Sequence, residues 1–189
     1  MVNKRELILE IAMRLFTGYG YEATGVQEIC EAAEVTKPTL YHYFKSKQGL
    51  LETLLQEKQV GFQDTLRQAC EYKNDLTGNI SSVMRRYFCF TKDEPVFYRL
   101  RLTLSYAPTK SGAYRAILPW LIEEHKLLAA LFKAAAEDHG NMRERDETCA
   151  LSLLGTINVY ALEILNGRLM LDEGLIYRAQ HQFMHGIFS

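Results

Sequence analysis

The chain has 189 residues, of which 48% are apolar and 24% are charged, the composition of an ordinary soluble globular protein. A chain of this length buries about 70% of its unfolded surface, enough for a core without disulfides or structural metals. The formal net charge is −1, so any affinity for nucleic acid has to come from the local placement of charges. The apolar runs are much shorter than a membrane span, and acidic residues interrupt the apolar N-terminus, unlike in a signal peptide. We therefore expect a cytoplasmic protein.

The cysteines and the C-terminal histidines do not form a metal-ligand pattern. The four cysteines lie far apart, without a Cys-x-x-Cys motif, at Cys30, Cys70, Cys89 and Cys149. This spacing favours reduced thiols over a zinc site or a disulfide framework. His181 and His185 are four residues apart, a spacing that can grip a metal, but no neighbouring acid or cysteine completes a ligand set. We expect no metal site and no cofactor.

The first predicted helix runs from Asn3 to about Tyr19. Asn3 and Glu6 have the spacing of a capping box, and the apolar residues that follow recur with a helical period. The next stretch, Thr24 to Lys47 (TGVQEICEAAEVTKPTLYHYFKSK), predicts two short helices joined by a tight turn. Thr24 or Gly25 can cap the first of these two helices, and Thr24 with Gln27 is a candidate capping box.

The second short helix has an outer surface suited to a polyanion. Thr36 has the character of an N-cap, and Pro38 falls in the first turn, where its missing N–H costs nothing. Leu40 and Phe44 are predicted to face inward. Three lysines and no acid occur between Thr36 and Lys47. Outward-facing positions are then Lys37, Thr39, Tyr41, His42 and Tyr43. A short helix, a turn and a helix rich in donors make up the helix-turn-helix layout.

The run TLYHYFKSKQGLL, preceded by ICEAAEV and GYEAT, resembles the DNA-binding domain of the tetracycline-repressor-like (TetR) family over residues 4–52. The family usually has Gly where Glu34 stands and Ser or Thr where Gly25 stands. A non-glycine residue in the left-handed conformation at this turn costs about 1 kcal/mol. The resemblance implies a homodimer that binds double-stranded operator DNA. The residues expected at DNA are Thr24, Gln27, Thr36, Lys37, Pro38, Thr39, Tyr41, His42 and Lys47.

The rest of the chain predicts six more helices, near residues 47–72, 80–92, 93–106, 113–138, 143–166 and 172–188. RLRLTLSY (99–106) alternates like a strand. A helix is nevertheless predicted there, because Pro95 follows two acids and no second strand is available to pair. The fold class is therefore all-α, three helices plus six. We expect a helix-turn-helix domain at residues 1–46 and an effector-binding and dimerisation domain at 47–189. A continuous helix from Lys47 links the two without a flexible linker.

Residues 80–106 concentrate aromatic rings and four arginines, from Arg85 to Arg101. Rings bury apolar surface and arginine pairs with carboxylate or phosphate, which predicts an amphipathic effector with an anionic group. The alternative is that these arginines face solvent or pair with Glu123 and Glu124. Candidate effector-binding residues are Tyr87, Phe90, Tyr98, Arg101 and Tyr106.

The last two predicted helices carry more apolar residues than one monomer needs to cover, which predicts a four-helix dimer interface. Its candidate residues are Leu154, Ile157, Ala161, Tyr177, Gln180 and Met184. No catalytic motif is found. The function expected is that of a ligand-responsive transcriptional repressor, released from a palindromic operator by a small amphipathic effector. The alternative is an all-α enzyme or small-molecule-binding protein with a vestigial helix-turn-helix.

Overall fold

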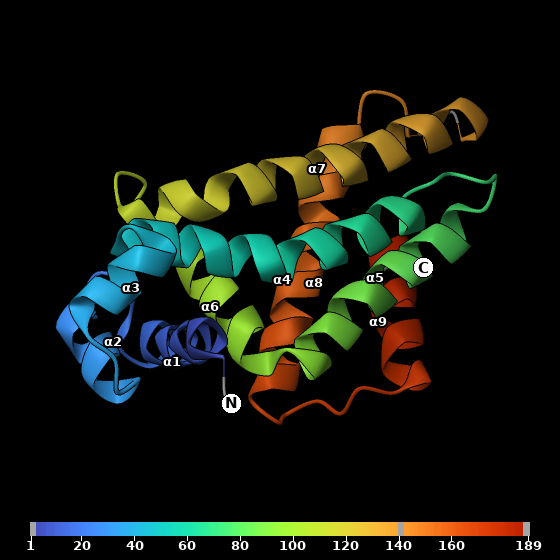
Figure 1. Ribbon diagram of the computed structural model, residues 1–189. Helices are drawn as coiled ribbons and strands as arrows, with labels where there is room; N and C mark the ends of the chain where they lie inside the picture. The colour runs from blue at the N-terminus through green and yellow to red at the C-terminus, as the bar shows by residue number, and fades with distance from the viewer. Residues whose placement is uncertain (1–2, 140–141, 187–189) are drawn as a thin grey trace. The chain divides into compact units, whose positions relative to one another are not determined.

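The computed structural model describes residues 3–139 and 142–186, and within these ranges every regular element is a helix (Figure 1). The elements are α1 (Lys4–Tyr19), α2 (Val26–Ala32), α3 (Lys37–Phe44), α4 (Lys47–Ala69), α5 (Leu76–Asp93), α6 (Pro95–Ser105), α7 (Gly112–Asp138), α8 (Asp146–Leu165) and α9 (Glu173–His185). The all-α fold class is confirmed. The alternating RLRLTLSY segment is helical, in α6, as predicted. The predicted end of the last helix at residue 188 lies outside the described residues.

The chain divides into two compact units. The first unit comprises Met1–Val60 and Val96–Leu121, and the second comprises Gly61–Pro95 and Ile122–Ser189. Helices α4 and α7 each contribute residues to both units. The predicted functional boundary at residues 46/47 does not coincide with this division, because the first unit also includes the first half of α4, α6 and the start of α7. The division at 46/47 remains a prediction about function.

Within the first unit, α1, α2 and α3 pack against one another (Figure 1). The apolar period of α1 buries Ile8 and Phe16 completely, α2 contributes Ile29, and α3 contributes Leu40 and Phe44. Leu40 and Phe44 are the inward-facing positions that the sequence predicted for α3. Burial of each large apolar side chain contributes about 1.5–3 kcal/mol relative to exposure, so one shared core stabilises three helices that are too short to be stable alone.

The turn between α2 and α3 contains the left-handed residue expected from the sequence. Glu34 has φ +51°, and Lys45, the C-cap of α3, has φ +66°. Both residues have a Cβ, so each turn carries a conformational cost of about 1–2 kcal/mol that glycine would avoid. The two turns that bracket α3 are therefore held by the surrounding core rather than by local preference.

The first turn of α5 and the end of α4 differ from the sequence prediction. The sequence predicts a helix only from about residue 80, whereas α5 begins at Leu76. Asp75 is its N-cap, and the Asp75 Oδ1 accepts a hydrogen bond from the Gly78 N–H at 2.8 Å. Asn79 then donates to the carbonyl of Ala69 at 2.7 Å, next to the end of α4. Polar residues that suggested a loop are thus used as a helix cap and as a tie between neighbouring segments.

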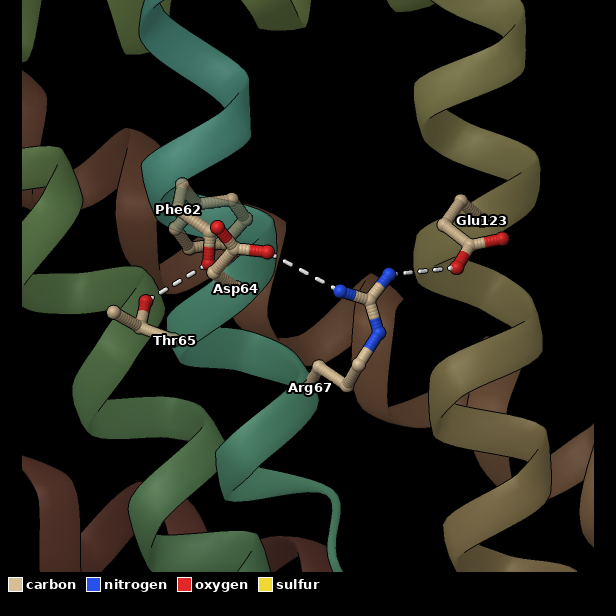
Figure 2. A network of polar contacts seen from close by, with 5 residues as sticks. All are labelled: Phe62, Asp64, Thr65, Arg67 and Glu123. Carbon is tan, nitrogen blue, oxygen red and sulfur yellow. Dashed lines mark hydrogen bonds and ion pairs between the residues drawn. The ribbon is translucent and has the colours of Figure 1, made fainter.

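In the second unit, α5 lies beside α8 and α9 (Figure 1). On the other side of this unit, Arg67 of α4 donates to Asp64 at 3.2 Å and to Glu123 of α7 at 3.1 Å (Figure 2). Both carboxylates and the guanidinium are about half exposed, so solvent screens the pairs and each contributes about 0–1 kcal/mol. These contacts direct the Arg67 side chain toward α7, and they add little to the stability of the unit.

Two glycines of α4 provide a test of the junction between α3 and α4. A Cβ on Gly49 would lie 2.2 Å from the backbone oxygen of Phe44, whereas a Cβ on Gly61 would have no neighbour within 4 Å. We expect Gly49→Ala to lower the free energy of unfolding by about 1–3 kcal/mol, because the backbone has to move. Gly61→Ala, on the same helix, should raise it by about 0.5–1 kcal/mol, because alanine is the better helix former.

Urea denaturation of the two variants measures both changes against the wild type. Equal stability of Gly49→Ala and the wild type would contradict the close approach of α4 to the end of α3.

Candidate nucleic-acid interface

One side of helix α3 packs in the core of the first unit. Thr36 is its N-cap, and the Thr36 Oγ1 accepts a hydrogen bond from the Thr39 N–H at 3.4 Å. Pro38 lies in the first turn, as predicted. Leu40 and Phe44, one turn apart, are 0% and 3% exposed. With these two side chains facing inward, the remaining positions of α3 are directed away from the core.

The outward side of α3 presents cations and hydrogen-bond donors. Tyr41 and Tyr43 are 42% and 39% exposed, and Lys37, Pro38 and His42 are exposed as well. Thr39 is half-buried, with its hydroxyl 3.0 Å from that of Thr36. Such side chains can donate to phosphate oxygens and to base edges in a major groove. The structure therefore places on one exposed surface the α3 residues that the sequence selected, together with the cap residue Thr36.

Thr24 does not belong to this surface, which corrects the sequence-based assignment. It is only 1% exposed, and its hydroxyl donates to the carbonyl of Gly20 at 2.8 Å. The N-cap of α2 is Gly25, whose backbone N–H donates to a Glu28 carboxylate oxygen at 3.3 Å. The capping box is thus formed by Gly25 and Glu28, one residue later than the predicted pair of Thr24 and Gln27. Thr24 instead stabilises the loop between α1 and α2.

Gln27 lies on the exposed side of α2, where its amide donates to Glu31 at 2.7 Å. One turn further along α2, Cys30 is buried, and this burial raises the pKa of its thiol, while the charge of Lys37 acts in the opposite direction. Gln27 is therefore accessible to a ligand, whereas the Cys30 thiol is held neutral in the core of the helix-turn-helix.

Lys47 has a different role from the phosphate contact expected of it. Its ammonium donates to the carbonyls of Tyr21 at 2.9 Å, Thr24 at 3.0 Å and Glu22 at 3.4 Å. It also lies 4.4 Å from the centre of the Tyr21 ring. An ammonium has three N–H donors, and the loop between α1 and α2 accepts all three. Lys47 thus ties the first turn of α4 to that loop.

The Tyr21 side chain reinforces this junction. Its hydroxyl donates to Gln48 Oε1 at 2.9 Å, and burial, with smaller effects of Glu22 and Glu52, raises the pKa of Tyr21 to about 12. The hydroxyl therefore stays protonated and keeps its donor at any physiological pH. A Cβ on Gly112, the first residue of α7, would lie 2.8 Å from the same Gln48 oxygen. The start of α7 is thus in close contact with the helix-turn-helix part of the first unit.

The candidate effector residues fall into both units. In the second unit, Tyr87 is fully buried, and its hydroxyl donates to Glu124 at 2.8 Å. The Phe62 ring stacks on Phe90, with centroids 4.5 Å apart, and meets Tyr87 edge-on at 4.9 Å. Thr91 adds a buried hydroxyl, which donates to the Tyr87 carbonyl. Tyr87 and Phe90 therefore belong to one aromatic cluster, beside which lie the hydroxyl groups of Tyr87 and Thr91.

In the first unit, α6 carries Tyr98 and Arg101 inside the protein. Tyr98 is 0% exposed and Arg101 is 2% exposed, with the guanidinium 5.3 Å from the Tyr98 ring centre. Tyr106, by contrast, is 78% exposed just beyond the end of α6. Its assignment to a buried effector site is wrong, because the helix ends at Ser105 and the ring is directed to solvent.

The arginines of this region differ in their surroundings. Arg85 forms a two-pronged pair with Glu173 at the start of α9, with its second contact at 2.5 Å. The hydrogen bonds from Arg85 lower the pKa of the Glu173 carboxyl. Arg85 thus pairs with an acid of α9, and Glu123 of α7 pairs with Arg67. Burial distinguishes Arg101 from Arg85, because Arg101 is 2% exposed whereas the Arg85 side chain is 40% exposed.

The candidate dimer residues separate into two groups. Ile157 and Ala161 of α8 are fully buried, and Gln180 of α9 is 9% exposed and donates to the Thr77 carbonyl at 3.0 Å. These three side chains lie inside the second unit, which corrects their assignment to the dimer interface. Leu154 is half-buried, and Tyr177 and Met184 are exposed.

Exposed apolar residues on α8 that the sequence analysis did not select are Leu151, Val159 and Leu162. Among the described helices, α8 alone has the length and apolar composition that could cross a membrane, and only 22% of it is buried. One such helix is weak evidence for a span. It does show that α8 is apolar on nearly all sides, which is why periodicity could not tell its inward face from its outward face.

Within the described part of the chain, no three His, Cys, Asp or Glu side chains gather in a way that could hold a metal ion. The His181 and His185 rings pack against each other, with centroids 4.5 Å apart, and His181 also contacts the Tyr177 ring. This pair is part of the surface of α9.

Three helices with a donor-rich third helix, joined to a larger helical part, define a helix-turn-helix transcriptional regulator. Residues 8–54 match the family model described as "Bacterial regulatory proteins, tetR family". The transcriptional activator FasR of Mycolicibacterium smegmatis is 26% identical over 99% of this chain and 84% of its own length. The transcriptional regulator YvkB of Bacillus subtilis is 49% identical over 55 residues, which are 29% of this chain and 28% of YvkB.

Among solved structures, FadR of Bacillus subtilis, in complex with stearoyl-CoA, aligns with a TM-score of 0.77 at 19% identity, covering 96% of this chain and 98% of FadR. Residues 8–54 therefore form a DNA-binding domain of the TetR family, and the chain shares its fold with FadR. The resemblance seen in residues 4–52 is thereby confirmed, and the similarity of fold extends over both units.

Tyr41 provides a test of the outward surface of α3. Because its ring is exposed and forms no part of the core, we expect Tyr41→Ala to keep the melting temperature and to weaken binding to DNA from the flanks of its own gene by at least about tenfold. Tyr106→Ala removes a still more exposed tyrosine outside α3 and should bind like the wild type. A quantitative gel shift compares the three proteins, and normal binding by Tyr41→Ala would refute the assignment of α3 as recognition helix.

Proposed function

We propose that the protein is a ligand-responsive repressor that binds a palindromic operator as a homodimer and is released by an amphipathic effector. The proposed DNA binding rests on the outward surface of α3, which is formed by Lys37, Thr39, Tyr41 and His42 together with Gln27 of α2. In a two-fold dimer the two copies of α3 would enter adjacent major grooves, about 34 Å apart. Repression follows if this spacing matches the operator without effector.

The first unit supports a route from effector to DNA. Lys47 and Gln48, at the start of α4, bind the loop between α1 and α2, and Gly112, at the start of α7, closely approaches Gln48. A displacement of α4 or of the start of α7 would therefore change the position of α3. For an effector to weaken operator binding about a hundredfold, its affinity for the two states has to differ by about 2.7 kcal/mol.

The homodimer is supported by the apolar surface of the second unit. Leu151 and Val159 of α8 are each 62% exposed, and Tyr177 of α9 is 63% exposed. A hollow of about 620 Å³ between α8 and α9 is lined by Val159, Tyr177 and neighbouring residues. Apolar side chains gathered in this way mark a protein interface, and a second copy of the same surface would bury them symmetrically.

Charge substitution tests this interface. Leu151→Glu and Val159→Glu would each bury a carboxylate in the dimer, at a cost of several kcal/mol, so we expect monomers in sedimentation and loss of operator binding. Gln68→Glu adds the same charge to an exposed position of α4 in the same unit and should remain dimeric. Intact dimers in both α8 variants would rule out an α8 interface.

For the effector, we propose a long-chain acyl compound with an anionic head, such as an acyl-coenzyme A. FadR, whose fold this chain shares, was solved with stearoyl-CoA. In the first unit, the buried Tyr98 ring has apolar surface, and the guanidinium of Arg101, 5.3 Å from the centre of that ring, carries a permanent positive charge. Arginine pairs well with carboxylate or phosphate. A polycation would find no comparable partner on α6, which carries no acid.

A thermal-shift measurement tests the class of effector. At about a hundred times its Kd, a bound acyl-coenzyme A should stabilise the protein by about 2.7 kcal/mol, a rise of roughly 5–10 °C in melting temperature. Arg101→Met should lose most of this rise, whereas Arg86→Ala, an exposed arginine of α5, should keep it.

Free coenzyme A and a cationic dye of similar size are the ligand controls. Stabilisation by the dye and none by the acyl compounds would contradict an anionic amphiphile. A gel shift with the stabilising compound then shows the direction of the response: release is expected for a repressor, whereas tighter binding would make the protein an effector-dependent activator, as the name of FasR implies for that relative. A DNA-binding regulator of this kind acts in the cytoplasm, at the nucleoid.

A further inference from the structure

The inward stripe of α4 contains one residue that does not fit an apolar core. Leu51, Leu55 and Gln59 follow each other at intervals of four residues, so their side chains lie on the same face of the helix. All three are 0% exposed. Two leucines are the expected residues of such a stripe, whereas an amide at the third position brings a strongly polar group to the same depth.

The amide of Gln59 lacks hydrogen-bond partners. Neither its Oε1 nor its Nε2 meets a partner among the described residues. By contrast, the buried hydroxyl of Thr24, in the same unit, donates a hydrogen bond to the Gly20 carbonyl. Nearly all buried polar side-chain atoms in proteins are satisfied, and an unsatisfied amide destabilises the folded state. A leucine at position 59 would continue the stripe without this penalty, so the amide needs an explanation outside the folding of the chain.

We propose that Gln59 is the polar anchor of the effector site, binding a neutral donor–acceptor group of the ligand. This inference rests on the effector-responsive function proposed above and assigns a contact within it. A glutamine amide has an acceptor oxygen and two N–H donors. A ligand group with both a carbonyl and an N–H or O–H satisfies both ends of it.

The chemistry of the amide narrows the class of ligand group. A bare carboxylate only accepts and would leave Gln59 Oε1 unsatisfied, and an ammonium only donates and would leave Nε2 unsatisfied. A charge at a fully buried position would also lose its hydration. An amide meets the requirement, and the pantetheine arm of an acyl-coenzyme A carries amides close to its acyl chain. Gln59 would therefore select acyl chains joined to an amide-bearing arm over free fatty acids.

The experiment compares Gln59→Leu with Gln63→Leu in the full-length protein. Gln63 is a second buried glutamine of α4, one turn away, and it has an interaction of its own. Two quantities are measured for each variant: the melting temperature without ligand, and the affinity for palmitoyl-coenzyme A. For Gln59→Leu we expect a melting temperature raised by roughly 2–8 °C and an affinity lowered at least about tenfold. Gln63→Leu should melt at a lower temperature than the wild type.

The two measurements separate the proposal from its alternatives. A lower melting temperature for Gln59→Leu would overturn the proposal, because the amide would then have a structural partner such as a buried water. A higher melting temperature with unchanged affinity would also overturn it, because the amide would not touch the ligand. If the wild type binds no acyl-coenzyme A, the acyl effector proposed above fails and this contact fails with it. Normal wild-type binding with an unaffected variant removes only the role of Gln59.

Discussion

The hydrogen bonds of Lys47 to the loop between α1 and α2 are the interaction on which the architecture of the first unit depends. Three carbonyls accept from one ammonium, and Tyr21 adds a bond to Gln48. The two turns around α3 have residues in the left-handed conformation, at Glu34 and Lys45, so local preference alone would not hold that helix. The junction at Lys47 and the shared core of α1–α3 fix the direction in which α3 presents its outer surface.

A protein without excess positive charge has to bind a polyanion through a few local side chains. The net charge of the chain is −1, and Lys47 is occupied internally. What remains for DNA is a small set of exposed donors on α3 and on α2. Because Leu40 and Phe44 occupy the inward positions of α3, Lys37, Tyr41, His42 and Tyr43 are left exposed, and Thr39 is half-buried. Under the function proposed above, a modest number of phosphate contacts per half-site would suit binding that an effector reverses, since each contact adds to affinity.

The second unit faces a different constraint, because its most apolar helix is poorly covered. Helix α8 packs against α5, and its Ile157 and Ala161 are buried, while Leu151 and Val159 remain exposed. Folding of this unit therefore leaves apolar surface that association would bury. In the homodimer proposed above, dimerisation and DNA binding would be linked physically, because a two-fold operator would be matched only when two copies of α3 are held together.

The sequence by itself determined the all-α fold, the extent of most helices and the helix-turn-helix, because helical periodicity, the Thr36 cap and Pro38 are local features. It also identified the left-handed turn at Glu34. Only the tertiary structure decided that Thr24 and Lys47 are parts of a junction, since a threonine or lysine near a helix start has the same local pattern whether it meets DNA or a carbonyl. Periodicity likewise could not orient α8, which is apolar all round, or reveal the unpaired amide of Gln59. Which side of a helix is covered, and which polar atom finds a partner, depends on residues distant in the sequence.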